Sequence, residues 1–193
     1  MKRKKIVIPV ILLAFVIGSA VYASGESRNI SPESLEIRPG SIEWAFTNNG
    51  VRPEKKLIGM INATEKTLDV AIFALTNPGI VKAIKDAKKR GVAVRVITDK
   101  GQAETKTQAQ ALKLFLRAGI PVKINTHDGL MHLKMAISDE NIVSTGSFNY
   151  TKAAANKNDE ILMFLSDPEV ARSFKLQFEK MWVDKQHFSD YRF

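Results

Sequence analysis

The sequence predicts an α/β fold, with a mixed, largely parallel β-sheet flanked by helices on both faces. Apolar runs of strand length alternate with segments of helical period from residue 41 onward. The runs at 68–75 and 92–97 are almost wholly apolar, as in strands that are buried on both faces. The segment between them carries lysines on one side and aliphatic residues on the other, as a helix that covers a sheet does.

The length of the chain indicates one domain, and its composition limits the chemistry and the partners to consider. A chain of 193 residues has room for a single sizeable core, and the absence of cysteine excludes a thiol nucleophile and a cysteine zinc site. The formal net charge is +9; residues 24–193 keep 25 basic and 20 acidic side chains. This balance favours a polyanionic partner such as nucleic acid, although an ordinary soluble basic surface explains it equally well.

The first 23 residues are typical of a targeting signal. Four basic residues precede an apolar run, and Val21-Tyr22-Ala23 offers a small-x-small cleavage site. We therefore expect export, with the protein secreted, periplasmic or held at the outer face of the cytoplasmic membrane. The apolar stretch 6–23 has 18 residues, at the lower limit of a bilayer span, so an uncleaved membrane anchor is the alternative.

The first elements after the leader follow from local composition. Residues 24–40 are polar and contain Pro32 and Pro39, which predicts a linker before a domain at 41–193. Residues 41–46 alternate as a strand does, and 47–50 reads as a turn. A helix is expected from Arg52, because Pro53 suits a first helical turn.

The middle of the chain alternates between strands and helices. After the strand at 68–75, Asn77 and Pro78 begin a helix that Gly91 ends before the strand at 92–97. The lysines of this helix could contact a nucleic-acid backbone, but a solvated surface is the simpler interpretation. Residues 99–106 are predicted to form a polar loop, 103–118 a helix, and 122–124 a short strand.

The last third contains three more predicted strands and a helix. Apolar runs predict strands at 130–137, 142–145 and 161–165, with a turn at Glu140-Asn141 between the first two. Asp167 and Pro168 then begin a helix whose apolar stripe is most simply core. The tail 185–193 is aromatic and basic, so it either packs on the domain or stacks with nucleic acid.

One constellation carries the chemistry. His132 and Lys134 alternate with apolar residues, so a strand would place both on one face, where they could meet one phosphate. Asp139 follows Lys134 after four residues, and the tetrad Gly146-Ser147-Phe148-Asn149 follows on the next predicted strand. An imidazole, an ammonium and an amide within eighteen residues suit phosphoryl transfer.

This pattern resembles the HKD signature of the phospholipase D superfamily, and is most similar to the small bacterial endonucleases with one motif per chain. Residues 67–99 and 181–193 resemble the same group. The resemblance implies the phospholipase D/nuclease fold and a phosphodiesterase that needs no metal. His132 would form a phosphohistidine, and a second histidine would come from a second chain. We therefore expect a homodimer with the active site at its interface.

The resemblance also implies roles for the other residues. Lys134 and Asn149 would hold the non-bridging phosphate oxygens, and Ser147 and Gly146 would support the phosphate pocket. Glu160 matches the acidic residue that orients the histidine ring, although an ordinary carboxylate at a strand start would look the same.

Asp139 matches the motif aspartate, to which the resemblance gives a structural part. Asp139 and Gly146 could also be present for turn chemistry alone. Leu133 and the sequence Ser138-Asp139-Glu140 depart from the commoner motif without removing a reacting group.

The expected function is a metal-independent endonuclease of low sequence specificity that acts on DNA or RNA. Two alternatives remain open: hydrolysis of phospholipid headgroups at a membrane, and a catalytically idle nucleic-acid-binding protein. His127 and Asp128 form no zinc motif with His132, and His187 lies in the tail. No P-loop or dinucleotide fingerprint is present, so no cofactor is expected.

Overall fold

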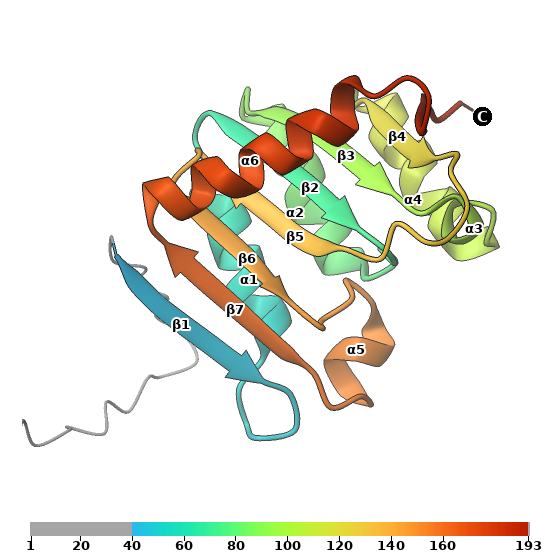
Figure 1. Ribbon diagram of the computed structural model, residues 1–193. Coiled ribbons are helices and arrows are strands. Elements are labelled where there is room, and N and C mark those ends of the chain that lie inside the picture. The colour runs from blue at the N-terminus through green and yellow to red at the C-terminus, as the bar shows by residue number, and fades with distance from the viewer. Residues whose placement is uncertain (1–39, 193) are drawn as a thin grey trace, which may run out of the picture. The chain divides into compact units, whose positions relative to one another are not determined.

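The computed structural model describes residues 40–192 (Figure 1), whose strands form one eight-stranded sheet in the order β1-β7-β6-β5-β2-β3-β4-β8. The strands are β1 (Ser41–Phe46), β2 (Thr67–Ile72), β3 (Ala93–Thr98), β4 (Val122–Asn125), β5 (Lys134–Ser138), β6 (Ile142–Gly146), β7 (Ile161–Ser166) and β8 (Phe188–Asp190). The helices in this range are α1 (Pro53–Ala63), α2 (Pro78–Lys89), α3 (Lys100–Ala103), α4 (Lys106–Arg117), α5 (Lys152–Asn156) and α6 (Pro168–Val183).

The predicted leader, and the predicted linker apart from Gly40, lie outside the described residues. Within residues 40–192, no helix combines the length and the apolar character that crossing a membrane requires.

The sheet is mixed, but less parallel than the sequence suggested. Only the β2–β3 and β3–β4 neighbours run parallel, and the other five pairs of neighbouring strands are antiparallel. The strands β5 and β6 are joined by a turn of three residues, 139–141, which is too short for a parallel connection and so produces an antiparallel pair. The prediction of a largely parallel sheet was therefore wrong, whereas the α/β class with helices on both faces is confirmed.

Two apolar cores lie on the two faces of the sheet. One joins α1, α2, α4 and α5 to the sheet, and its largest buried side chains include Phe115, Phe148, Tyr150 and Phe164. The other lies under α6, which Figure 1 shows crossing the near face. Successive strand residues point to opposite faces, so each central strand contributes to both cores. This explains why the runs at β2 and β3 are almost wholly apolar.

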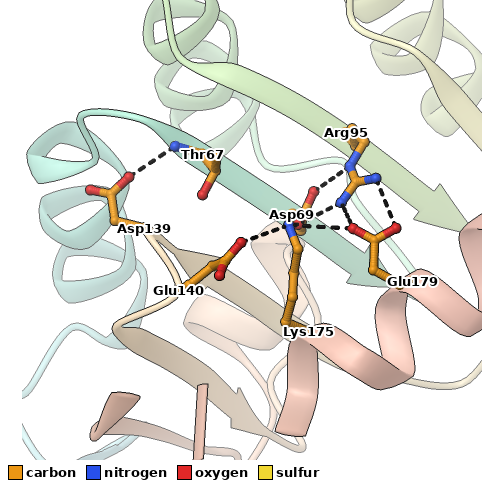
Figure 2. A network of polar contacts seen from close by, with 7 residues as sticks. All are labelled: Thr67, Asp69, Arg95, Asp139, Glu140, Lys175 and Glu179. Carbon is orange, nitrogen blue, oxygen red and sulfur yellow. Dashed lines mark hydrogen bonds and ion pairs between the residues drawn. The ribbon is translucent and has the colours of Figure 1, made fainter. Parts of the chain in front are cut away.

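The one charged residue of β2, Asp69, fixes α6 to the sheet (Figure 2). Its side chain is 2% exposed and accepts hydrogen bonds from Arg95 Nε at 2.7 Å and from Lys175 Nζ at 2.6 Å. Arg95 also binds Glu179 of α6 at 2.6 Å and lies 4.9 Å from the centre of the Phe178 ring. A buried carboxylate is tolerated because two cations compensate its lost hydration.

Several boundaries differ from the sequence prediction. The segment 99–106 holds the short helix α3, and α4 begins at Lys106 rather than near 103. The strand expected from residue 130 begins only at Lys134, and the following turn is centred on Asp139 and Glu140, both with positive φ. The elements α5 and β8 were not predicted. The tail packs on the domain as β8, where Phe188 is 6% exposed.

The antiparallel pairing brings the predicted site residues to one end of the sheet. At this end β2, β3 and β6 finish, while β5 and β7 begin. Lys134 therefore pairs with Ile72, and Gly146 pairs with Leu162 of the next strand.

Candidate active site

His132 and Lys134 are in direct contact. The ammonium Nζ of Lys134 lies 3.0 Å from each ring nitrogen of His132 and donates to the His132 carbonyl oxygen at 2.9 Å. His132 is exposed, whereas Lys134 is only 7% exposed at the start of β5. A cation held against an accessible imidazole can attract a phosphate to that ring.

The ring of His132 packs on Phe73, the residue that follows β2. Their centroids are 4.7 Å apart in an edge-to-face arrangement, and Lys134 Nζ lies 5.3 Å from the centre of the same Phe73 ring. The Phe73 N–H donates to the Leu133 carbonyl at 2.9 Å. His132 itself precedes the strand, so its place depends on these contacts as well as on sheet register.

Asp99 holds the backbone immediately before His132. Its carboxylate is 2% exposed at the end of β3 and accepts the Met131 N–H at 3.1 Å through Oδ2. Its other oxygen caps α3 by accepting the Gln102 N–H at 3.0 Å. Asn125 assists by donating to the Gly129 carbonyl at 3.2 Å. A buried carboxylate bound to two backbone donors gives this loop one conformation.

Asn149 follows β6 and lies beside the end of β2. Its side-chain oxygen accepts the Ala74 N–H at 3.3 Å. The next residue, Tyr150, is fully buried and exchanges backbone contacts with Ala74 and Thr76. With its oxygen engaged by the backbone, the amide nitrogen of Asn149 is the group that can donate to a ligand.

Glu160 binds Ser147 and Asn158. Ser147 Oγ donates to Glu160 Oε2 at 2.5 Å, and Asn158 Nδ2 donates to Oε1 at 3.1 Å. Among the described residues no hydrogen bond joins this carboxylate to His132 of the same chain. The backbone N–H of Glu160 donates to Thr47 Oγ1 at 2.8 Å, which ties the start of β7 to the end of β1.

Burial of its side chain lowers the pKa of Lys134, and the negative charge of Glu160 opposes that fall. A partly desolvated ammonium interacts more strongly with an approaching phosphate than a hydrated one does. The same desolvation makes this lysine easier to deprotonate than a surface lysine.

Asp139, the predicted motif aspartate, lies away from the other predicted site residues. It follows Ser138, the last residue of β5, and Ser138 lies roughly 13 Å from Lys134 along the strand at the usual rise per residue. Its carboxylate accepts three backbone N–H groups, those of Glu65, Lys66 and Thr67, at 2.7–2.9 Å. Figure 2 shows the contact with Thr67. The structural interpretation of this residue is the one the contacts support.

Gly146 lies where two strands approach each other closely. Its φ is +144°, and a Cβ built on it would lie 2.2 Å from the Ile161 carbonyl oxygen of β7. The missing side chain therefore lets β6 and β7 approach. The N–H of Ser147 donates to that same Ile161 oxygen at 3.0 Å.

The sequence did not single out Phe73, Asp99 or Gln108. Gln108 is fully buried on α4, donates to Thr98 Oγ1 at 2.8 Å and accepts the Leu75 N–H at 2.8 Å. It thereby joins the ends of β2 and β3 beside the site. The sequence did contain one signal for Gln108, since it falls on the apolar face of the predicted helix. A buried amide needs hydrogen-bond partners, so its position predicts polar contacts there.

The fold and the sequence both match known proteins. Residues 57–182 match the family model described as "Cardiolipin synthase, PLD-like domain". The solved structure of Nuc, a phospholipase D family member from Salmonella typhimurium, has 30% sequence identity and a TM-score of 0.73. That match covers 79% of this chain and 99% of the Nuc chain. NucT from Helicobacter pylori has 25% identity and a TM-score of 0.66, with 74% and 96% covered.

Curated relatives point to the same family. The mitochondrial cardiolipin hydrolase of Chlamydomonas reinhardtii is 36% identical over 75% of this chain and 65% of its own length. The human protein of that name is 34% identical over 66% of this chain and 50% of its own length. A protein named phospholipase D from Rickettsia conorii is 29% identical over 90% of this chain and 94% of its own. The chain thus spans about half to two thirds of the cardiolipin hydrolases that it matches.

Proposed function

Because the chain belongs to the phospholipase D superfamily, we propose that it hydrolyses nucleic-acid phosphodiester bonds as an endonuclease that needs no metal ion. The observation that carries the proposal is the contact of Lys134 Nζ with both ring nitrogens of His132 at 3.0 Å. The similarity to Nuc, which covers 99% of the Nuc chain, supports this proposal. The motif itself also resembles that of the single-motif endonucleases.

The reaction proceeds in two steps on His132. A neutral ring nitrogen attacks phosphorus, so a nitrogen–phosphorus bond forms as the bond to the leaving oxygen breaks. A second imidazole gives that oxygen a proton. Water then attacks the phosphohistidine, returns a proton to the second imidazole and frees His132. Lys134 and the Asn149 amide bind the non-bridging oxygens, whose charge is most localised in the transition state.

The second imidazole comes from another copy of the chain. The other two histidines, His127 and His187, lie 6.3 Å apart beside β8, and neither contacts His132 in the described structure. His187 is already bound to Asp184 at 2.8 Å. A two-fold axis would supply an equivalent His132 with its own Lys134.

An exposed apolar stripe supports the homodimer. Ile42, Trp44 and Phe46 of the edge strand β1 are 59%, 57% and 47% exposed, and they share one sheet face. They are paired with Leu165, Met163 and Ile161 of β7, in that order. We call these six residues the β1–β7 stripe. A contiguous apolar surface of this kind is typical of an interaction site.

The β1–β7 stripe reaches the candidate active site. Phe46 and Ile161, at its end, line a cleft of about 310 Å³ together with Ser147 and Glu160. Two copies that pair through the stripe would therefore bring these site residues toward their interface. Glu160 would then be placed to reach a ring of the other copy, which accounts for its lack of contact with His132 of its own chain.

Phospholipid hydrolysis is the second candidate, favoured by the curated relatives named cardiolipin hydrolase and phospholipase D. The chemistry at phosphorus would be the same, with a lipid alkoxide or a headgroup as the leaving group. A membrane association through the N-terminal segment would bring the site to such a substrate. Export of the chain is part of the proposal, and cell fractionation with protease protection tests it.

The experiment incubates the full-length chain with plasmid DNA, single-stranded RNA, and vesicles of cardiolipin or phosphatidylcholine, all in EDTA. The His132→Ala variant is the control, because His132 is exposed and its loss leaves the core unchanged. Nicking or RNA cleavage that disappears with His132 supports the endonuclease. Release of a lipid product without nucleic-acid cleavage supports the second candidate instead. Binding without turnover would contradict both.

A further inference from the structure

Two clefts that neither the motif nor the mechanism uses lie side by side next to the reacting groups. The first has a volume of about 560 Å³ and is bounded by the segment after β2, the beginning of α4 and the beginning of α5. Five of its lining residues carry a hydroxyl or amide side chain: Thr76, Gln102, Thr105, Thr107 and Thr151.

This first cleft shares a wall with the active site. Ala74 lines it and donates its N–H to the side chain of Asn149 at 3.3 Å. Thr151 also lines it and donates its N–H to the Asn149 carbonyl at 2.8 Å. When the reacting phosphate of a substrate binds Asn149, the neighbouring group of that substrate would therefore lie at this cleft.

The second cleft, about 550 Å³, continues from the first. Pro78 and Lys152 line both, so the two form one groove. The far part is lined by the beginnings of α1 and α2 and by α5, with Arg52, Lys55, Asn77 and Asn156 among its residues. We call the combined feature the Lys152 groove.

The charge of the Lys152 groove suits a phosphate backbone. Among the residues that the structure describes, neither Lys152 nor Lys55 has a carboxylate within ion-pair distance, and both are exposed. Glu54 is the acidic residue in the wall, and Arg52 neutralises it through a contact of 2.5 Å between Nε and Oε1. The ammonium groups are thus free to bind an anion.

We propose that the Lys152 groove binds the part of a nucleic-acid strand that flanks the scissile phosphodiester. Lys152 and Lys55 contact flanking phosphates, and the threonine hydroxyls contact sugar and phosphate oxygens. The groove selects a strand over a phospholipid because its walls hold few large apolar side chains, Ile58 among them. This inference rests on the proposed function and makes it specific, because it requires kcat/KM to increase with the length of the strand.

The test measures kcat/KM of the full-length chain on single-stranded oligonucleotides from two to about sixteen nucleotides, and on bis(p-nitrophenyl) phosphate, which is too small to enter the groove. The double variant Lys55→Ala/Lys152→Ala removes both free ammonium groups. A second variant, Thr107→Glu, puts a carboxylate into the first cleft at a helix beginning, where an acidic residue favours folding. The matched control is Lys180→Ala/Lys185→Ala, which removes two exposed lysines from α6 and the tail.

For the wild type, kcat/KM rises with length. Both groove variants lower it about tenfold on the longest strands and leave the small diester unchanged. The double variant also reduces the slope of log kcat/KM against log salt concentration by about 1.4. The control matches the wild type. Equal cleavage of long strands by all variants would overturn the groove while the endonuclease stands. Hydrolysis of the small diester or of cardiolipin vesicles without cleavage of any oligonucleotide would overturn the proposed function, and the groove with it.

Discussion

The ammonium of Lys134 lies equally close, at 3.0 Å, to both ring nitrogens of His132, and it also donates to that residue's own carbonyl. The imidazole is thereby held beside a positive charge whichever of its nitrogens attacks. The nucleophile and the group that binds the phosphate are one unit, separated in sequence by Leu133 alone.

The first prediction concerns pH. Burial places the pKa of Lys134 below its ordinary value of 10.5, so its ammonium is lost as pH rises through that lowered pKa. The rate should therefore fall on the alkaline side at a pH below 10.5. In Lys134→Arg the guanidinium stays charged throughout, so the residual activity should lack this alkaline limb. Rates on a small diester across the pH range, with folding followed by circular dichroism, check the prediction. An identical alkaline limb in both proteins would contradict it.

The second prediction concerns the homodimer. Replacing Trp44 with lysine places a charge at the centre of the β1–β7 stripe and should convert dimer to monomer, with loss of turnover. Light scattering after gel filtration, with activity at the same concentration, measures both. Leu176→Lys is the control, since Leu176 is 59% exposed on α6 and Trp44 is 57% exposed on β1. If Trp44→Lys remained a dimer, the stripe would not be the interface.

The third prediction concerns Gly146. A methyl group there meets the Ile161 carbonyl oxygen at 2.2 Å, so Gly146→Ala must displace β7 or the end of β6. We expect a loss of unfolding free energy of about 3 kcal/mol or more, measured by urea denaturation. Gly129→Ala separates the two causes, because its φ is also positive, at +86°, but no atom lies within 4 Å. That control should lose only about 1–2 kcal/mol. Equal losses of unfolding free energy in the two variants would mean that the positive φ, and not the contact with Ile161, causes the destabilisation.

The fourth prediction concerns Asp139. Asp139→Asn keeps a residue that tolerates positive φ but leaves the three N–H groups of residues 65–67 with a weaker acceptor. The unfolding free energy should fall by about 1–3 kcal/mol, while kcat of the folded protein stays close to the wild-type value. A large loss of kcat with unchanged stability would return Asp139 to the reacting groups.

The fifth prediction concerns Asp99, a positioning residue. In Asp99→Asn an amide N–H₂ can face the Met131 N–H, which disturbs the backbone one residue before His132. Because small displacements of a nucleophile cost much rate, kcat should fall about 10–100-fold while KM changes little. Asp190→Asn, at an exposed residue 3.9 Å from Lys123, is the matched control. A rise of KM at constant kcat would contradict positioning.

Most elements of the fold could be predicted because residues close in sequence determine where they begin and end. Asn77 with Pro78, and Asp167 with Pro168, cap α2 and α6 where the sequence placed them. What failed depends on distant partners. The three residues of β8 are a strand only because β4 lies beside them. Three of the residues 130–133 are apolar, but Asp99 takes the Met131 N–H and β2 ends opposite Lys134. In the described structure, the bond from the Phe73 N–H to the Leu133 carbonyl continues the pairing by only one position.

The candidate site was predictable to the same extent. The contact between His132 and Lys134 could be anticipated from their spacing, although an irregular segment rather than a strand brings them together. The separation of Asp139 from them follows from the length of β5, which motif spacing does not express. The polar loop 99–106 stands at a strand end, where site-lining residues are common. The particular role of Asp99 could not be predicted, because its partner is a backbone N–H some thirty residues away, and such partners leave no mark in composition.

The hairpin of β5 and β6 sets the register between the two halves of the motif. Its turn contains only the three residues 139–141. Two of them, Asp139 and Glu140, have left-handed backbones, and the strand pairing places Met135 opposite Thr145. One inserted residue in this turn would offset the two motif halves by one position and rotate one set of side chains to the face of α6. The length of this turn therefore decides which face of the sheet carries each half of the motif.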